Sequence, residues 1–276
     1  MIVYLKLIRI QNLIIGSLAV LVANYSIKTY DVLLLCHCIL SVILAMSFGN
    51  ILNDIIDLKP DKISHPNRPL PMEQINISSA KKLLFILCIL IIITSFFLNI
   101  TSRVCLLLVV LPLLISYNFY FKNTPLLGNI IISFLLAFVF IFTELVFLNE
   151  LKIMIIPSLL VFGLSLIREF LKDIHDYEGD KTHNIQTLPV KIGQNKSISI
   201  AILMIIVFCV LSLFPYFINF YYINYLISLI ILVEIPLIVL VSLLLRNPNK
   251  LMFRKILSIT KIISLSGLLV ILISNN

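Results

Sequence analysis

The acidic residues of this chain gather in two short segments. Six of its seven aspartates lie within residues 49–61, which read GNILNDIIDLKPD, or residues 168–180, which read REFLKDIHDYEGD. Carboxylate oxygens are hard ligands that suit Mg²⁺, a metal that commonly shares its coordination with substrate phosphates. The two segments therefore indicate metal-assisted chemistry on a phosphorylated substrate.

Both segments space their polar residues in the same way. Intervals of 4, 3 and 4 separate the members of each set: Asn50, Asp54, Asp57 and Asp61, and then Glu169, Asp173, Asp176 and Asp180. Such steps keep side chains on one face of a helix, so each set is predicted to form a polar stripe. Pro60 and Gly179 precede the last aspartate of each set, and we expect the helices to end there.

Three carboxylates on one helical face repel one another and are costly near a bilayer, so they need a cation. Two such faces would leave room between them for a diphosphate that carries Mg²⁺. The predicted metal-binding and catalytic residues are Asp54, Asp57, Asp61, Asp173, Asp176 and Asp180. The competing interpretation, solvated acids paired with nearby lysines, is favoured for a single cluster but not for two copies at matched spacing.

The elements that position these segments are predicted to be membrane helices. Hydrophobic side chains make up 61% of the 276 residues and charged ones only 12%, which excludes a soluble globular domain. Apolar runs of about 20 residues predict bilayer-spanning helices. We identify nine, at 7–27, 31–52, 80–100, 104–121, 126–147, 153–172, 197–217, 221–245 and 256–273. The expected fold is all-α integral membrane, with nine transmembrane helices around a central cavity, in two related helical bundles that form a single domain over residues 1–276.

Positive charge is distributed unevenly between the predicted loops. Of 21 Lys and Arg residues, only Lys28, Arg103 and Lys152 fall in the loops after the first, third and fifth spans. The positive-inside rule then places the N-terminus and both acidic segments on the cytoplasmic side of the plasma (inner) membrane. Because this asymmetry also explains the net charge of +8, no nucleic-acid partner is expected. Nothing in the pattern implies an obligate protein partner.

At the acidic segments the chain resembles the UbiA superfamily of intramembrane prenyltransferases. The family's first motif, Asn-Asp-x-x-Asp-x-x-x-Asp, is matched in full by residues 53–61, and Asn-Arg-Pro-Leu-Pro follows at 67–71. The second motif, Asp-x-x-x-Asp, matches Asp176 and Asp180, with Asp173 one turn earlier and Thr-Leu-Pro-Val at 187–190. The resemblance covers essentially the whole chain.

The resemblance implies transfer of a prenyl group from a polyprenyl diphosphate to a membrane-soluble acceptor. Mg²⁺ would neutralise the departing diphosphate, and the apolar interior would keep water from the resulting allylic carbocation. The polar stripe and the family pattern together give the candidate substrate-binding residues: Asn12, Asn50, Asn53, Arg68, Tyr117, Lys122, Arg168 and Lys172.

Lys122 is the strongest candidate cation for the diphosphate, because residues 117–122 resemble the family's Tyr…Lys segment. The alternative is that Lys122 is an ordinary lysine that follows the positive-inside rule. Arg68 either contacts phosphate or braces its loop. Arg168 either contacts substrate or forms a structural ion pair with Glu169.

The start of the first span carries a further resemblance. Arg9 and Asn12 match an Arg-x-x-Asn pattern of the family's first helix, although Ile10 stands where the family usually has Pro. An asparagine in an apolar run is costly unless it is hydrogen-bonded. Asn12 is therefore expected either to reach the acceptor or to tie the first span to the second.

Residues 168–180 look most like the geranylgeranylglycerol-phosphate geranylgeranyltransferase branch of the family. Members of that branch join a second prenyl chain to a hydroxyl of a prenylated glycerol phosphate. The expected substrates are thus geranylgeranyl diphosphate and a prenylglycerol phosphate. An aromatic acceptor, as in quinone, haem or chlorophyll pathways, stays open, as does internal cyclisation of the cation.

Two other classes of membrane protein use similar residues. A cation-coupled carrier also has intramembrane acids in repeated halves, but near the midplane rather than at helix ends that run into basic loops. A phospholipid-headgroup transferase of the CDP-alcohol type also combines aspartates with a divalent metal. Its Asp-Gly and Ala-Arg pairs do not occur in the first segment.

Overall fold

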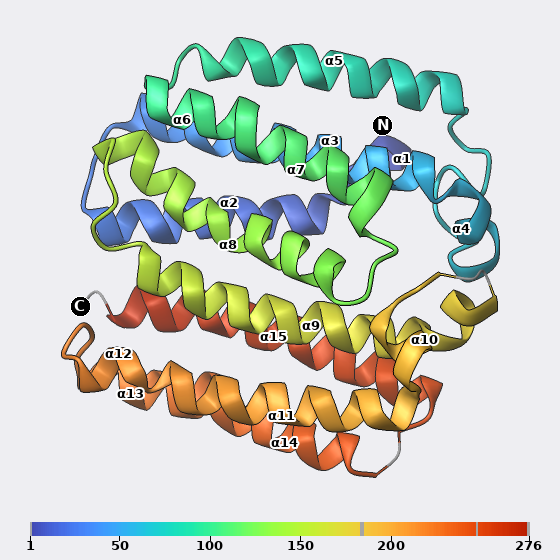
Figure 1. Cartoon of the computed structure of the whole chain (residues 1–276). Coiled ribbons are helices and arrows are strands. Elements are labelled where there is room, and N and C mark those ends of the chain that lie inside the picture. The colour runs from blue at the N-terminus through green and yellow to red at the C-terminus, as the bar shows by residue number, and fades with distance from the viewer. Residues whose placement is uncertain (1, 183–184, 247, 275–276) are drawn as a thin grey trace. The chain divides into compact units, whose positions relative to one another are not determined.

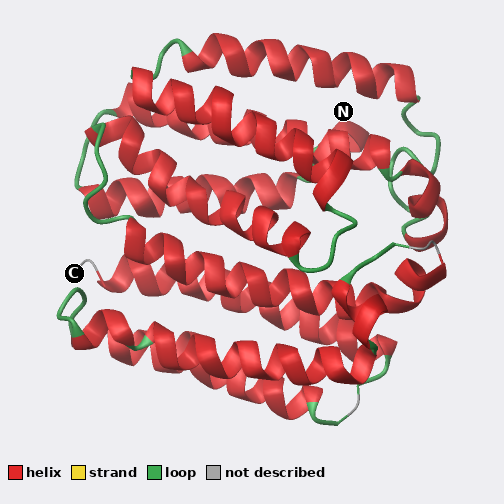
Figure 2. Ribbon diagram, in the orientation of Figure 1, coloured by secondary structure: helices red, strands yellow, loops and turns green. Residues whose placement is uncertain are grey.

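The computed structural model describes residues 2–182, 185–246 and 248–274. Helices joined by short loops make up these residues, and no strand occurs among them (Figure 2). The predicted all-α fold is therefore confirmed.

Most predicted spans correspond closely to helices. Within the described ranges, eight stretches are long and apolar enough to cross a membrane: Ile10–Ile27, Val32–Ile56, Ile77–Ser95, Ile100–Phe121, Leu127–Leu148, Gln194–Phe217, Ile223–Leu244 and Leu251–Ser274. The ninth predicted span, 153–172, lies in α9 (Ile155–Thr182), whose apolar run also carries Arg168, Glu169 and Lys172. Each predicted span thus has a helical counterpart.

The chain divides into two compact helical units, in agreement with the two predicted bundles. Unit 1 comprises Met1–Lys122 and Phe138–Lys152, and unit 2 comprises Asn123–Ala137 and Ile153–Asn276. Each unit is described by itself. The central cavity and the single domain over the whole chain stay predictions.

Unit 1 holds the first acidic segment. Its elements are α1 (Ile2–Leu7), α2 (Ile10–Ile27), α3 (Val32–Ile56), α4 (Leu58–Ser64), α5 (Ile77–Ser95), α6 (Ile100–Val104), the π-helical η1 (Cys105–Val110), α7 (Leu111–Ser116), the π-helical η2 (Tyr117–Phe121) and the second part of α8 (Leu127–Leu148). The long helix α3 packs against α2 and α5 (Figure 1). Its first turn is capped by Asp31, whose carboxylate accepts a hydrogen bond from the Leu34 N–H at 2.9 Å.

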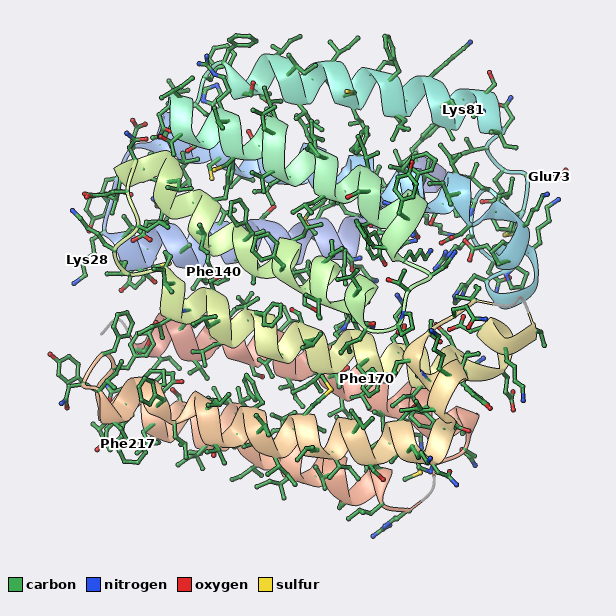
Figure 3. All side chains as sticks on the ribbon, in the orientation of Figure 1. Lys28, Glu73, Lys81, Phe140, Phe170 and Phe217 are labelled. Carbon is green, nitrogen blue, oxygen red and sulfur yellow. The ribbon has the colours of Figure 1, made fainter. Side chains whose placement is uncertain are left out.

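The loops of unit 1 alternate between its two ends. Figure 3 shows Lys28, which follows α2, at one end of the bundle, and Glu73 and Lys81, which flank the start of α5, at the other. Helices that each cross a bilayer require this alternation of loops.

Unit 2 holds the second acidic segment. Its elements are the first part of α8, α9, α10 (Leu188–Ile192), α11 (Gln194–Ser212), α12 (Phe214–Phe217), α13 (Ile223–Leu229), the π-helical η3 (Ile230–Glu234), α14 (Ile235–Leu244) and α15 (Lys250–Ser274). Helix α9 packs against both α11 and α15 (Figure 1). Phe170, labelled in Figure 3, is fully buried in the core that these helices share.

Two π-helical turns precede prolines. Pro112 follows η1 and Pro236 follows η3, each at the second residue of the next helix. A proline ring clashes with the carbonyl four residues earlier and donates no hydrogen bond. Widening the preceding turn relieves this clash, so the helix continues across the proline.

The expectation that helices end at Pro60 and Gly179 is wrong. The helix of the first acidic segment, α3, ends earlier, and α4 begins after a break at Asp57. Pro60 therefore lies in the first turn of α4. The first N–H groups of a helix have no partner within it, so proline is tolerated there. Helix α9 continues through Gly179 to Thr182. Asp61 and Asp180 therefore both lie on helices.

Close packing of α9 against α11 depends on Gly163. A Cβ at this position would come within 2.6 Å of the Phe208 ring. Because small residues allow membrane helices to approach closely, we expect Gly163→Leu to lower the free energy of unfolding by about 1–3 kcal/mol through overpacking. Thermal unfolding in detergent measures this effect as a lower midpoint.

Gly179→Ala is the matched control, because a Cβ at Gly179 meets nothing within 4 Å. Removing a glycine from a helix favours the folded state, so its midpoint should stay the same or rise. Equal midpoints for Gly163→Leu and the unmodified protein would contradict the close packing of α9 and α11.

Candidate active site

The first acid cluster consists of Asp54, Asp57 and Asp61 in unit 1. Asp54 lies in the last turns of α3, Asp57 at the break between α3 and α4, and Asp61 on α4. The side chains of Asp54 and Asp61 are only 2% and 5% exposed. Buried carboxylates require charged or hydrogen-bonding partners.

A cation from a separate segment contacts each aspartate of this cluster. Arg9, from the junction of α1 and α2, pairs with Asp54. Arg68, from the loop after α4, has Nη1 2.5 Å from Asp61 Oδ2 and 3.5 Å from Asp54 Oδ1. Burial raises the pKa of Asp61, and the charge and hydrogen bond of Arg68 oppose that rise.

The third cation is Lys122, which pairs with Asp57. It follows the π-helical turn η2, where its backbone N–H donates to the Tyr117 carbonyl at 2.9 Å. The same turn positions Asn118, whose amide donates to the Leu114 carbonyl at 2.8 Å. This turn therefore places Lys122 beside the first acid cluster, and its contact with a diphosphate stays a prediction.

Amide side chains connect the cations to the cluster. Asn53 accepts a hydrogen bond from Arg9 at 3.0 Å and donates one to Asn118 at 3.2 Å. Asn50 donates to the Ile8 carbonyl at 2.9 Å. Asn50 thus holds the turn that carries Arg9, and Asn53 orients the Arg9 side chain.

Arg9 was not among the candidate site residues drawn from the sequence. It has a left-handed backbone, with φ 57° and ψ 60°, between α1 and α2. This conformation costs an L-residue about 1–2 kcal/mol. The turn interrupts the predicted span 7–27. It brings the Arg9 guanidinium to Asp54, which is 45 positions farther along the chain. Asn12, which the sequence did select, is half-buried one turn farther along α2, and its N–H donates to the Arg9 carbonyl at 2.8 Å.

The second acid cluster lies along α9 in unit 2. Asp173, just past the predicted span 153–172, accepts a hydrogen bond at 2.9 Å from Asn129, near the start of α8. Desolvation raises the pKa of Asp173 to about 7, although this hydrogen bond opposes the rise. Asn129 was not predicted as a site residue, but a lone amide in an apolar run signals the need for a partner.

Two other acidic residues of α9 have local partners. The buried Glu169 carboxylate is 2.7 Å from Arg168 and 3.3 Å from Lys172, so the structural ion pair considered for Arg168 is present. Asp176 Oδ1 is 2.7 Å from Nδ1 of the adjacent His175. A further contact joins α9 to the residue that precedes α10.

That contact is made by Thr187, whose hydroxyl donates to Asp180 at 3.2 Å. Thr187 precedes the first residue of α10, and its side chain is buried. The Thr-Leu-Pro-Val stretch therefore braces the last aspartate of the second motif.

No group of three or more His, Cys, Asp and Glu side chains within the described ranges is arranged to bind a metal. The carboxylates of the first cluster contact cations instead. Mg²⁺ is typically bound through one or two carboxylates, with waters and substrate phosphates as its other ligands. The oxygen donors fit such a shared site better than an all-protein metal cage.

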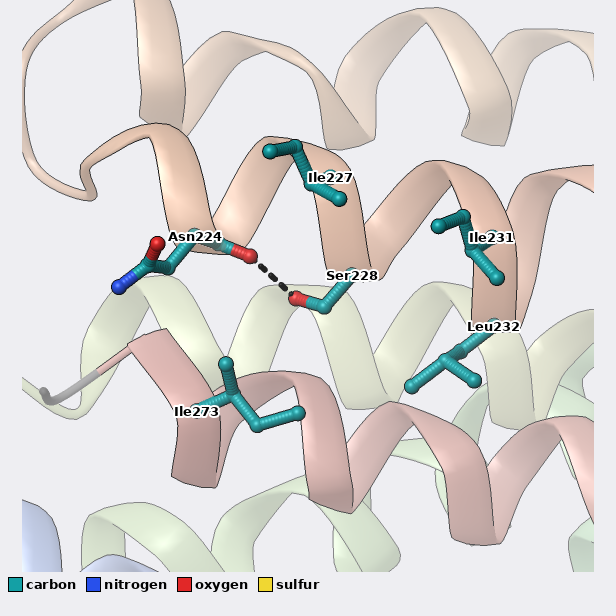
Figure 4. Close-up of a pocket in the computed structure, with 6 residues that line it drawn as sticks. All are labelled: Asn224, Ile227, Ser228, Ile231, Leu232 and Ile273. Atoms are coloured by element: carbon teal, nitrogen blue, oxygen red, sulfur yellow. Dashed lines mark hydrogen bonds between the residues drawn. The ribbon is translucent and has the colours of Figure 1, made fainter.

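A pocket of about 340 Å³ lies elsewhere in unit 2 (Figure 4). It is lined by Asn224, Ile227, Ser228, Ile231, Leu232 and Ile273. None of these residues is charged, and the Ser228 hydroxyl donates to the Asn224 carbonyl at 2.7 Å. The pocket therefore offers no charged group that could neutralise a diphosphate.

Comparison with known proteins identifies the family. The family model described as "UbiA prenyltransferase family" matches residues 12–262. The digeranylgeranylglyceryl phosphate synthase of Methanocaldococcus jannaschii is 35% identical over 269 residues, which cover 94% of this chain and 91% of the relative. That of Sulfurisphaera tokodaii is 36% identical over 246 residues, 87% of each chain.

Solved structures agree with this assignment. A structure described as digeranylgeranylglyceryl phosphate synthase in membranes superposes with a TM-score of 0.75 at 33% identity, over 99% of this chain and 97% of that one. A UbiA homologue from Archaeoglobus fulgidus, bound to GPP and Mg²⁺, shares the fold at 16% identity, with a TM-score of 0.66 over 98% and 99% of the two chains. This multi-pass membrane protein is a prenyltransferase, and it belongs to the UbiA family.

Proposed function

We propose that this protein transfers a geranylgeranyl group from geranylgeranyl diphosphate to a hydroxyl of a geranylgeranylglycerol phosphate, with Mg²⁺ as cofactor. The main support for this proposal is the first acid cluster, where Asp54, Asp57 and Asp61 each contact a cation from a different segment. Carboxylates for a metal and cations for phosphate oxygens are the two ligand types that a metal–diphosphate requires. The names of the relatives supply the proposed acceptor.

The proposed metal ligands are the aspartates of both clusters: Asp54, Asp57, Asp61, Asp173, Asp176 and Asp180. This assignment rests on their oxygen donors, which suit a Mg²⁺ ion that shares its coordination with substrate phosphates. A homologue bound to GPP and Mg²⁺ supports the choice of metal. When bound, Mg²⁺ would neutralise charge on the diphosphate and make it a better leaving group.

The cations of the chain would bind the diphosphate oxygens. We assign this role to Arg68 and Lys122, which already lie beside the first cluster. Arginine suits phosphate because its planar guanidinium donates two parallel hydrogen bonds. Asn53 would hold the neighbouring side chains in place, and Tyr117 would position Lys122 through the π-helical turn.

In unit 2, Arg168 and Lys172 flank Glu169 and are proposed to contribute positive charge near the second cluster. Asn12 and Asn50 lie beside the turn that carries Arg9. We propose that Asn12 faces substrate and that Asn50 acts by holding this turn.

Loss of the diphosphate would leave an allylic carbocation. The oxygen of the acceptor hydroxyl would form the new C–O bond, and its proton would pass to the released diphosphate. Water is the competing nucleophile. The apolar side chains of the helices would exclude it and hold the prenyl chain. The proposed reaction thus alkylates the oxygen of the acceptor hydroxyl and forms an ether.

We propose the plasma membrane as the location, with both acid clusters cytoplasmic. The positive-inside rule supports this orientation, because few Lys and Arg residues occur in the alternate loops. In unit 1 the end that carries Glu73 and Lys81 would then be cytoplasmic, and the end that carries Lys28 would face outwards (Figure 3).

The test is release of pyrophosphate by purified protein in vesicles, given geranylgeranyl diphosphate, geranylgeranylglycerol phosphate and Mg²⁺. We expect release that requires the acceptor and stops when EDTA removes the metal. Omitting each component in turn is the control. No release with either a glycerol-phosphate or an aromatic acceptor would contradict the proposal.

A further inference from the structure

The negative charge of the first acid cluster is compensated by cations of the chain itself. Three aspartates, Asp54, Asp57 and Asp61, are matched by three cations from three parts of unit 1. These cations come from the junction of α1 and α2, the loop after α4, and the end of η2. The charges of the three aspartates are therefore compensated through tertiary contacts rather than by residues that are neighbours in the chain.

Several contacts hold Arg9 in this arrangement. Its backbone is left-handed, the carbonyl of the preceding Ile8 is held by Asn50 at 2.9 Å, and its guanidinium contacts both Asn53 and Asp54. Asp54 is 2% exposed and the Arg9 side chain 29% exposed. In such a partly buried pair, removing one charge leaves the other poorly solvated.

This balance opposes the binding of Mg²⁺ by itself. A bare metal ion must displace a cation from the carboxylate it binds, and the displaced cation then lacks an anion. No group of three His, Cys, Asp or Glu side chains in the described parts of the chain offers the ion a ready set of ligands. Diphosphate removes the obstacle, because its oxygens can accept the displaced cations and also complete the coordination of the metal.

We propose that Arg9, Arg68 and Lys122 are exchangeable counter-ions, so that Mg²⁺ and diphosphate bind the first cluster together and Mg²⁺ alone binds it weakly. This inference deepens the proposed function and rests on it, since it takes a metal–diphosphate as the ligand. Arg9 is a positioning residue in this scheme: it compensates the charge of Asp54 and holds that side chain in place until the ligand arrives.

The test measures Mg²⁺ affinity by calorimetry on the full-length protein, with and without saturating geranylgeranyl thiodiphosphate, an analogue that ionises poorly. In the unmodified protein the analogue should tighten Mg²⁺ binding at least about tenfold, which is about 1.4 kcal/mol. In Arg9→Gln we expect Mg²⁺ alone to bind at least about fivefold more tightly, and the effect of the analogue to shrink, because one competing cation is gone.

Thermal unfolding gives a second readout that does not depend on activity. Mg²⁺ alone should stabilise Arg9→Gln, where it replaces the lost charge beside Asp54, and should barely stabilise the unmodified protein. The effect should vanish when Asp54→Asn is added to Arg9→Gln, which makes the pair a double-mutant cycle. Arg9→Lys, which keeps the charge, should behave like the unmodified protein.

Arg103→Gln is the matched control. Arg103 also lies in unit 1, but its guanidinium donates to the carbonyls of Ser95, Phe96 and Leu98, away from the acids. Its substitution should leave Mg²⁺ affinity unchanged with and without the analogue.

The outcomes separate the two ideas. If the analogue and Mg²⁺ bind but Mg²⁺ alone binds equally well, or if Arg9→Gln weakens Mg²⁺ binding, the counter-ion exchange is wrong and the proposed function stands. If the analogue does not bind the unmodified protein in the presence of Mg²⁺, the proposed function itself fails.

Discussion

Asp54→Asn is expected to lower the turnover of this prenyltransferase on the order of 10²–10³-fold, the range seen when one preorganised electrostatic contact to the reacting group is lost. The Asp54 carboxylate is almost fully buried and contacts both Arg9 and Arg68. An amide of the same size retains hydrogen-bonding atoms but loses the charge that would bind Mg²⁺. The measurement is the rate of pyrophosphate release at saturating substrates and metal.

Asp31→Asn is the control for this substitution. Asp31 is the one aspartate outside the two clusters, and its role is to cap α3 through the Leu34 N–H. Asparagine caps helices about as well as aspartate, so turnover should not change. Turnover within about threefold of normal for a folded Asp54→Asn protein would contradict the metal-binding role of the first cluster; a tenfold change corresponds to about 1.4 kcal/mol in the barrier.

Lys122→Gln should lower turnover by about 10²-fold, because a charge-assisted contact to the leaving diphosphate is lost. Lys122 pairs with Asp57 and is held by the π-helical turn that begins at Tyr117. Steady-state kinetics should show the loss in kcat as well as in kcat/KM, since charge builds up on the diphosphate as it departs. Lys122→Arg should recover part of the activity.

The comparison for Lys122→Gln is Lys152→Gln. Lys152 also forms an ion pair in unit 1, with Glu150, but both side chains are more than half exposed. Exposed pairs contribute about 0–1 kcal/mol to stability, so we expect normal turnover. Equal losses in the two variants would show that general charge, rather than the position of Lys122, is responsible.

Local patterns in the sequence were sufficient for the helices and for the acids on them. The intervals of 4, 3 and 4 predicted one-sided stripes, and in α9 all four residues do lie on one helix. In the first segment the helix breaks at Asp57, so that stripe is divided between α3 and α4. The rule that proline ends a helix favoured a break at Pro60, but the first turn of a new helix accommodates proline equally well.

The partners of the acids depend on tertiary structure, which local patterns do not encode. Arg9 reaches Asp54 only because its own backbone is left-handed. Arginine rarely adopts this conformation, and no neighbouring residue in the sequence predicts it. Asn129 stands out as a polar residue in an apolar run, yet its partner, Asp173, is 44 residues away. The sequence could indicate that such residues need partners, but not which partners they have.

The most direct test of the proposed function is the identity of the product. Purified protein in vesicles would receive geranylgeranyl diphosphate and Mg²⁺ with geranylgeranylglycerol phosphate, with an aromatic acceptor such as a hydroxybenzoate, or with no acceptor, and the extracted lipids would be analysed by mass spectrometry. We predict a glycerol phosphate that carries two geranylgeranyl ethers, formed only in the first reaction. A prenylated aromatic compound, or a cyclised hydrocarbon formed without acceptor, would contradict the proposal.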